Sequence, residues 1–550
     1  MMELRASGLT VAVLLASLFC AVETRAESLH EQIDRLIAAG TSNYSQIAAP
    51  LADDAEFLRR ITLDLTGTVP TIAQTRAFLA DPAPDKRQRT IDVLLASPEY
   101  ARHMEQTFDV ILMRRLPAKH VKAEEWQAYL LASFAANKPW HEIVRTMMTT
   151  DGGDPATRGA ARFLLDRDAD VNTITRDVSR LFLGANLECA QCHDHPLVED
   201  FHQEHYYGLA AFFNRSFVFT EKDKPTVLAE KGDGEVKFES VFEIRDKKSP
   251  GPKTTGPKVF SSATISDPTF AKPEEAYVVA PADKVRPIPK FSRRAKFAEF
   301  VVSPENRRFC RSTVNRVWAL LLGRGIVHPV DYDHTGNPPS HPALLALLTE
   351  EFANQNMDLK WLIREICLSQ TYQRSSKRTA EGPAPADDRF AVAIMKPLSP
   401  TQMAAAVLQA TGETDVQRAA LGDKLNEEAL HKQLIGYQQR YVQLFGGLAG
   451  KPTERFESTT DQVLYLMNDP QLLNLTMPHG NNLADRLLKL PADQMPALAD
   501  ELYVSVFNRP PTPEDVQDVQ QYLEGQTDRP AAMSQLIWSL VTSSEFRFNH

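Results

Sequence analysis

The stretch that most constrains the fold runs from Val171 to His193. Its apolar residues recur at helical spacing along one face, at Val171, Ile174, Val178, Leu181 and Phe182. Gly184 is expected to end this helix, and Cys189-Ala190-Gln191-Cys192-His193 follows within five residues of that glycine. A helix packed in a core therefore delivers a C-x-x-C-H motif to a fixed position.

The C-x-x-C-H spacing is the one that attaches a c-type haem. Cys189 and Cys192 would form the two thioether bonds, and His193 would be the proximal iron ligand. His195 is too near in sequence to reach the opposite face of the same iron. The distal ligand would then come from another side chain, or the sixth position would stay open; the candidates are His202, His205, Met104, Met113 and Met147.

The same cluster also suits a structural zinc site. Cys189, Cys192, His195 and either His202 or His205 form a Cys₂His₂ set of the kind that binds zinc tetrahedrally. A Cys189–Cys192 disulfide, or a reduced pair with a structural role, is the third alternative. No thioredoxin-like βαβ pattern surrounds the pair. Haem c is the leading expectation, and zinc is its main alternative.

The first 26 residues are typical of an export signal. Arg5 supplies a positive charge, 11–22 is an apolar run, and Thr24-Arg25-Ala26 is an acceptable cleavage site. We therefore expect a periplasmic, cell-surface or extracellular protein. Beyond this segment no apolar run is long enough to span a bilayer, so no integral membrane segment is expected after signal removal. Four cysteines would remain, too few for a disulfide-rich scaffold.

Composition narrows the partners. A formal net charge of −10, without a basic tail, predicts no nucleic-acid partner. The sequence contains no G-x-S-x-G, H-E-x-x-H, Walker A or G-x-G-x-x-G pattern, so no catalytic residue is assigned and enzymatic activity stays open.

The periodicity predicts a mainly α protein of two helical domains, 27–215 and 296–550, with a small β-rich insertion at 216–295. Capping boxes are expected at Thr71 and at Ser399, each with a glutamine three residues later. Within the insertion four apolar residues alternate with charged ones, which predicts a half-buried strand; they are Val236, Phe238, Phe242 and Ile244.

Other polar groups have ordinary explanations. A loop after Gly325 holds His328, Asp331, Asp333 and His334. Such a loop is more often solvated or turn-forming than a cation site. Arginines cluster on a helix at Arg307, Arg308, Arg311 and Arg316, where a salt-bridged face is expected. Cys310 and Cys367 are expected to be buried, unreactive thiols.

A weak internal repeat relates Leu63–Tyr100 to Val504–Phe546. Each stretch has a Pro-Thr turn, two helices and a closing Ser-x-x-aromatic sequence. Gene duplication and a common helix-turn pattern explain the repeat equally well.

Several longer motifs resemble known families. The run Phe57–Gly67 followed by Pro70-Thr71, the C-x-x-C-H block and Tyr206–Phe213 resemble a planctomycete cytochrome-like domain of unknown function. The second half is similar to the planctomycete-specific domain that usually follows it, through Asn315–Trp318, Gly323–Val327, Asn337–Pro342, Ser369–Tyr372, Leu466–Pro470, Asn508–Thr512 and Ser544–Phe546. The resemblance implies an exported bacterial protein of paired helical domains and supplies no reaction. Its cytochrome label rests on the same C-x-x-C-H motif.

Three functions are therefore carried forward. The first is an exported c-type haem protein that serves a redox partner protein. The second is a non-redox structural or interaction protein stapled by zinc or a disulfide. The third is an extracytoplasmic enzyme acting on polymers. A polysaccharide partner stays open without support from any residue pattern.

Overall fold

The computed structural model describes residues 27–378, 383–447 and 459–550. The predicted export signal lies outside these ranges. Within them no helix combines the length and the apolar character needed to cross a bilayer. The first part is helical and consists of α1 (Leu29–Ala39), α2 (Tyr44–Ile47), α3 (Asp54–Thr66), α4 (Ile72–Ala80), α5 (Lys86–Ala96), α6 (Pro98–Met113), α7 (Ala123–Ala135), α8 (Trp140–Thr149), α9 (Arg162–Leu165), α10 (Val171–Leu183) and α11 (Gln203–Phe213).

Several helix ends coincide with the signals in the sequence. The predicted capping boxes at Thr71 and Ser399 both form, so these two predictions are confirmed. Gly184 and Gly323 end their helices in the left-handed conformation, with φ of 62° and 80°. No loop separates α5 from α6, because Ser97 is both the C-cap of α5 and the N-cap of α6.

The predicted β-rich insertion consists of three separate two-stranded antiparallel sheets. The strands are β1 (Ser216–Phe219), β2 (Val227–Glu230), β3 (Val236–Phe238), β4 (Lys253–Thr255), β5 (Tyr277–Val279) and β6 (Ile288–Pro289). The predicted single strand is only half correct. Val236 and Phe238 lie on β3, but Phe242 and Ile244 lie on the short helix α12 (Val241–Arg245) and are exposed. Four residues of alternation do not distinguish a strand from one helical turn.

The remainder returns to helices, with one more small sheet. Its elements are α13 (Arg293–Val301), α14 (Arg307–Leu322), α15 (Pro342–Asn354), α16 (Leu359–Leu368), α17 (Gln370–Gln373), β7 (Lys396–Pro397), α18 (Pro400–Ala410), α19 (Glu413–Leu421), α20 (Glu427–Phe445), α21 (Thr460–Asn468), α22 (Pro470–Thr476), α23 (Leu483–Lys489), α24 (Met495–Val506), α25 (Pro513–Leu523), α26 (Arg529–Val541), α27 (Ser544–Arg547) and β8 (Phe548–Asn549). The protein is thus mainly α with a small β-containing region between its helical parts, as predicted.

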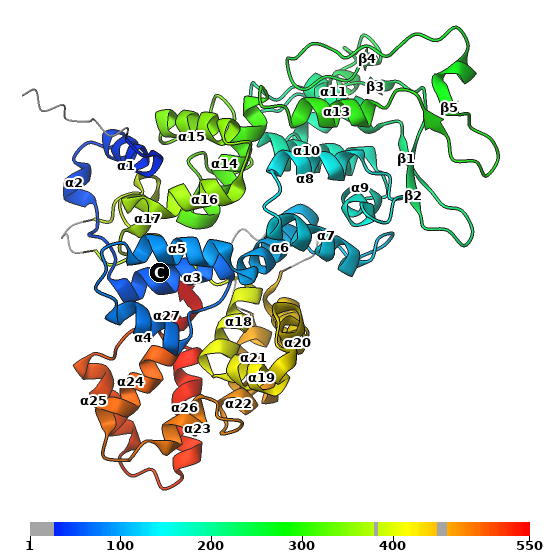
Figure 1. Ribbon diagram of the computed structural model, residues 1–550. Helices are drawn as coiled ribbons and strands as arrows, with labels where there is room; N and C mark the ends of the chain where they lie inside the picture. Colours follow the sequence, from blue (N-terminus) through cyan, green and yellow to red (C-terminus); the bar gives the residue numbers. More distant parts are fainter. Residues whose placement is uncertain (1–26, 379–382, 448–458) are drawn as a thin grey trace, which may run out of the picture.

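Two hydrophobic cores organise these elements. The first contains residues between Ile33 and Ala391, and the second contains Leu63, Val69 and residues from Leu398 to Phe546. Helix α3 lies between them, because Phe57 packs in the first core and Leu63 in the second. In Figure 1 the blue helices α3 and α4 lie between α17 and the orange and red helices α24 and α26. The insertion lies at the opposite end of the molecule from α24 and α25.

A buried arginine fastens α3 to the second core. The guanidinium of Arg59 donates to the carbonyl oxygens of Val506 (3.2 Å) and Phe546 (3.0 Å) and to Oδ1 of Asn508 (2.9 Å). Burial lowers the pKa of Arg59 to about 10. These charge-assisted bonds join the N-terminal and C-terminal parts of the chain.

The internal repeat has matching local geometry. Gly67 and Asn508 occupy equivalent places and are both left-handed, with φ of 72° and 60°. The following Thr71 and Thr512 both form capping boxes. The closing serines, Ser97 and Ser543, both accept a hydrogen bond from the backbone three residues on and so start the next helix.

Candidate cofactor-binding site

The C-x-x-C-H motif lies on a loop directly after α10. Cys189 begins a short 3₁₀ helix that runs to Gln191, and the N–H of Cys192 donates to the Cys189 carbonyl (3.2 Å). Side chains three residues apart eclipse each other in a 3₁₀ helix, so both sulfurs are expected on the same side. Both thiols are free and both residues are exposed, which leaves them accessible to a reaction partner.

His193 is held by its neighbour. Its Nδ1 lies 2.6 Å from the Asp194 carbonyl oxygen, so Nδ1 carries the hydrogen and donates it. This tautomer leaves the lone pair on Nε2, the arrangement that metal-binding histidines use when a backbone carbonyl orients them. The imidazole also stacks on the ring of Phe242, at 4.2 Å between centroids and 20° between planes.

His195 has a different role. Its Nδ1 accepts from the backbone N–H groups of Leu197 (3.1 Å) and Val198 (3.0 Å), and its Nε2 lies 3.3 Å from the hydroxyl of Tyr332. Burial, helped by the nearby His334 and His193, lowers the pKa of His195. Both ring nitrogens are therefore used to close the loop that follows the motif.

His202 and His205 lie at the start of α11. His202 is exposed, whereas Nδ1 of His205 is 3.0 Å from the Asp200 carbonyl oxygen. Burial also lowers the pKa of His205. Throughout the described ranges, no three His, Cys, Asp or Glu side chains are grouped to hold a metal ion. The Cys₂His₂ set is thus not assembled, and the candidate methionines Met104, Met113 and Met147 are buried in the first core.

The loop after Gly325 is bonded to the C-terminal end of α10, just before the motif. Asp331 pairs with Arg180 (2.8 Å) and with Arg316, and Asp333 pairs with Arg311 (2.7 Å). The backbone N–H of Asp333 donates to the Gly184 carbonyl (2.9 Å). The predicted salt-bridged face is thereby confirmed for Arg311 and Arg316, whereas Arg308 donates to the backbone carbonyl oxygens of Leu183 and Asp333. The aspartates are ion-paired rather than solvated, because this loop docks onto the end of α10.

Four exposed apolar side chains flank the motif. Leu197 is 87% exposed in the loop after His193, and α12 presents Val241, Phe242 and Ile244, which are 44%, 42% and 53% exposed. The N–H of Val241 donates to the Cys192 carbonyl (3.0 Å), so α12 starts at the motif. Val241 and Phe242 thus hold exposed apolar side chains next to Cys192 and His193, and exposed apolar groups of this kind are typical of binding sites.

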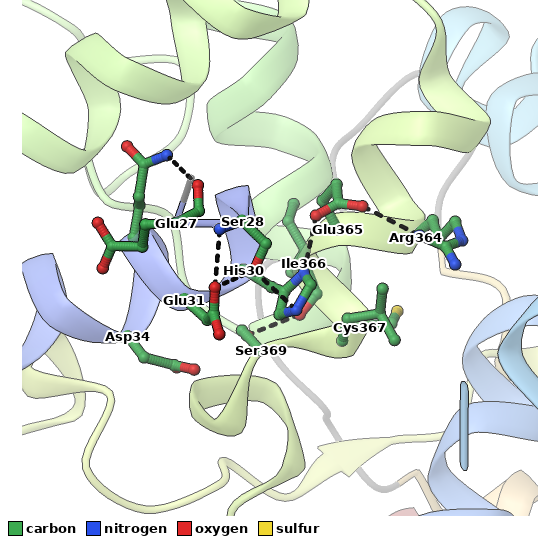
Figure 2. Close-up of polar contacts among 12 residues, drawn as sticks. Glu27, Ser28, His30, Glu31, Asp34, Arg364, Glu365, Ile366, Cys367 and Ser369 are labelled. Atoms are coloured by element: carbon green, nitrogen blue, oxygen red, sulfur yellow. Dashed lines mark hydrogen bonds and ion pairs between the residues drawn. The ribbon is translucent and has the colours of Figure 1, made fainter. Parts of the chain in front are cut away.

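The structure also brings together a polar cluster around His30 that the sequence did not reveal (Figure 2). Ser28 Oγ lies 2.9 Å from Nε2 of His30, and Nδ1 of His30 lies 2.9 Å from Oε2 of Glu365. Arg364 donates to the other Glu365 oxygen (3.1 Å). The order serine, histidine, glutamate matches the order of a catalytic triad.

The geometry instead favours a structural contact that holds α1 against α16. The Ser28 hydroxyl has a single proton, and Oε2 of Glu31, at 2.6 Å, is closer to it than His30. The hydroxyl therefore donates its hydrogen bond to the Glu31 carboxylate and not to the imidazole. Glu365 is 335 residues from His30, and no sequence signal could have connected the two.

Fold and site together define a mainly helical protein that presents an exposed C-x-x-C-H motif on a supported loop. Residues 32–217 match the PSCyt2 family model, described as "Protein of unknown function (DUF1549)". Residues 293–523 match the PSD1 model, described as "Protein of unknown function (DUF1553)". The chain thus carries these two domains of unknown function, in the order that the resemblance implied. Neither a curated protein nor a solved structure matches it.

Proposed function

We propose that this chain is an exported c-type haem protein that exchanges electrons with a redox partner protein. Cys189 and Cys192 would hold the haem through thioether bonds, and His193 would be the proximal ligand. The observation that carries the proposal is the contact between Nδ1 of His193 and the Asp194 carbonyl, because it leaves Nε2 free to bind iron.

The surroundings of the motif fit this group. Both thiols are exposed, as bond formation to two vinyl groups requires. The apolar side chains Leu197, Val241, Phe242 and Ile244 offer a surface for the apolar part of a porphyrin. Arg176, whose Nη1 is 3.4 Å from Oε1 of Gln191, adds a cation beside the motif that suits a propionate.

The chain's own residues have separate tasks. Asp194 orients the proximal imidazole through its carbonyl oxygen, and His195 closes the loop by capping two backbone N–H groups. A bound haem would supply a one-electron redox centre. Export agrees with the motif, since thioether attachment takes place outside the cytoplasm in bacteria.

Covalent attachment is the direct test. The full chain would be expressed with its signal in a host that matures c-type haem, purified, denatured and stained for haem on a gel. The wild type should keep its haem after denaturation, whereas Cys189→Ser and Cys192→Ser variants should lose it. Glu199→Ala, which changes an exposed side chain in the loop after the motif, is the matched control and should keep it.

Two results would overturn the proposal. A correctly exported wild type without covalent haem excludes a c-type haem protein. Stoichiometric zinc in that protein, lost in Cys189→Ser, would instead support a structural metal staple. A folded protein with neither group would direct attention to a scaffold role or to activity on polymers.

A further inference from the structure

We infer that the insertion acts as a clamp on the motif and that Phe242 is the positioning residue for His193. The inference rests on the proposed function, since it assigns the side chain that orients the proximal ligand. It also gives a role to a segment, Phe238–Arg245, that lies outside both matched family regions.

Two restraints fix the His193 ring. The Asp194 carbonyl holds Nδ1 at 2.6 Å, and the Phe242 ring covers one face of the imidazole at 4.2 Å and 20°. A single hydrogen bond leaves an imidazole free to tilt about that bond. A ring stacked on its face removes this freedom, so the direction of Nε2 is set before a ligand arrives.

Backbone contacts hold the clamp in register with the motif. The N–H of Val241 donates to the Cys192 carbonyl (3.0 Å). The amide of Gln203 bridges the carbonyl oxygens of Gln191 (3.4 Å) and Glu239 (3.2 Å). Phe242 directly follows Val241, whose backbone N–H is bonded to Cys192. The Phe242 ring stacks on the imidazole of His193, the residue after Cys192.

A tyrosine of α11 anchors the start of the clamp. The hydroxyl of Tyr207 donates to the Gln191 carbonyl (2.9 Å), and its ring stacks on Phe238, at 4.8 Å and 8°. The guanidinium of Arg245 lies over the Phe242 ring at 5.0 Å from the centroid, which adds a cation–π contact. The ring of Phe242 is thus held although 42% of the residue is exposed.

The test compares three variants of the full chain. Phe242→Leu keeps an apolar side chain without an aromatic face, and Phe242→Tyr keeps the face. Val278→Ala is the matched control, because it removes an exposed apolar side chain from β5, another element of the same insertion. Circular dichroism and thermal unfolding would establish that each variant folds.

The first readout is the haem-loaded protein. Phe242→Leu should lower the yield of covalent haem by about tenfold, as loss of a group orienting a metal ligand does, and shift the reduction potential. Phe242→Tyr should keep both at the wild-type level, and Val278→Ala should change neither. Equal yield and potential in wild type and Phe242→Leu would overturn the inference while leaving the proposed function intact.

The second readout needs no haem. In protein made without haem maturation and labelled at histidine, the His193 ring protons should be displaced upfield by the Phe242 ring, and Phe242→Leu should abolish the displacement. An unchanged His193 signal would overturn the inference. If wild type shows the displacement but never attaches haem, the proposed function fails and the role in haem ligation falls with it.

Discussion

Asp64 and Lys396, 332 residues apart in the chain, form an ion pair of 2.6 Å in which the aspartate side chain is only 5% exposed. Asp64 also accepts from the hydroxyl of Tyr372 (2.9 Å) and the amide of Asn549 (2.7 Å). A single carboxylate thus joins α3, α17 and both strands of the C-terminal sheet.

Removing this carboxylate should be costly. Asp64→Ala leaves the largely buried Lys396 ammonium without its counter-charge, and we expect a loss of about 3–5 kcal/mol in the free energy of unfolding. Urea denaturation would measure it. Arg35→Ala removes an exposed ion pair with Glu27 and serves as control, with little change expected. Equal free energies of unfolding for Asp64→Ala and Arg35→Ala would show that the buried contacts of Asp64 do not stabilise the fold.

Two glycines with positive φ allow the cost of backbone strain to be measured separately from the cost of crowding. Gly67 (φ 72°) would place a Cβ 2.5 Å from Nδ1 of His103, whereas Gly525 (φ 82°) has nothing within 4 Å of that position. Gly525→Ala should cost about 1–2 kcal/mol from strain alone. Gly67→Ala should cost about 1–3 kcal/mol more, since His103 is buried and must move. The two unfolding free energies, measured under the same conditions, decide whether crowding adds to strain.

A histidine contact should make the second core sensitive to pH. Burial alone would lower the pKa of His479, but the hydrogen bond to Glu413 (2.7 Å), the bond to the Met477 carbonyl and the nearby negative charges together outweigh burial and raise that pKa. A raised histidine pKa gives stability that is fully present below about pH 6.5 and is lost as the pH rises through the folded value. Unfolding measured across this range should show a steeper decline in wild type than in His479→Gln.

Glu105 should give a second pH dependence. Burial raises the pKa of this α6 carboxyl from 4.5 to about 8. The folded protein then keeps a proton that the unfolded chain releases, so stability falls as the pH rises from about 4.5 to 8. Glu105→Gln should remove this slope, while Glu124→Gln, at an exposed site on α7, should leave it unchanged. An unaltered slope in Glu105→Gln would place the titrating group elsewhere.

Thiol labelling should separate the cysteines into two pairs. Cys189 and Cys192 are exposed, whereas Cys310 and Cys367 are buried, and burial raises the pKa of Cys310 to about 11. A thiol reagent should therefore modify the first pair in the folded protein and the second pair only after unfolding. Mass spectrometry of digested protein identifies the modified residues; rapid native labelling of Cys310 would contradict the burial described here.

Helix ends and motifs that depend on residues close together in the chain could be predicted from the sequence. Thr71 and Gln74 form a capping box because both partners lie within one turn, and Gly184 and Gly323 end helices because a left-handed residue without a side chain is cheap there. For the same reason the Cys189–His193 motif was found in full.

The sequence could not predict contacts that the tertiary fold creates. The alternation through Phe242 suggested a strand, but a turn of helix formed because Val241 hydrogen-bonds to the motif. The loop that holds Asp331 was expected to be solvated or turn-forming, and the ion pairs of Asp331 were not predicted. Arg180 and Arg316 reach it from two helices and hold its pKa below the usual range despite burial. The pairing of His30 with Glu365 has no local signal at all.

The position of α3 between two cores has a consequence for biosynthesis. One core needs residues up to Ala391, and the other needs Leu63 together with residues up to Phe546. Residues 548 and 549 then pair with β7, beside Asp64. The first core is therefore complete only once residue 391 has been made, and α3 is covered by both cores only after the last residues of the chain have been added.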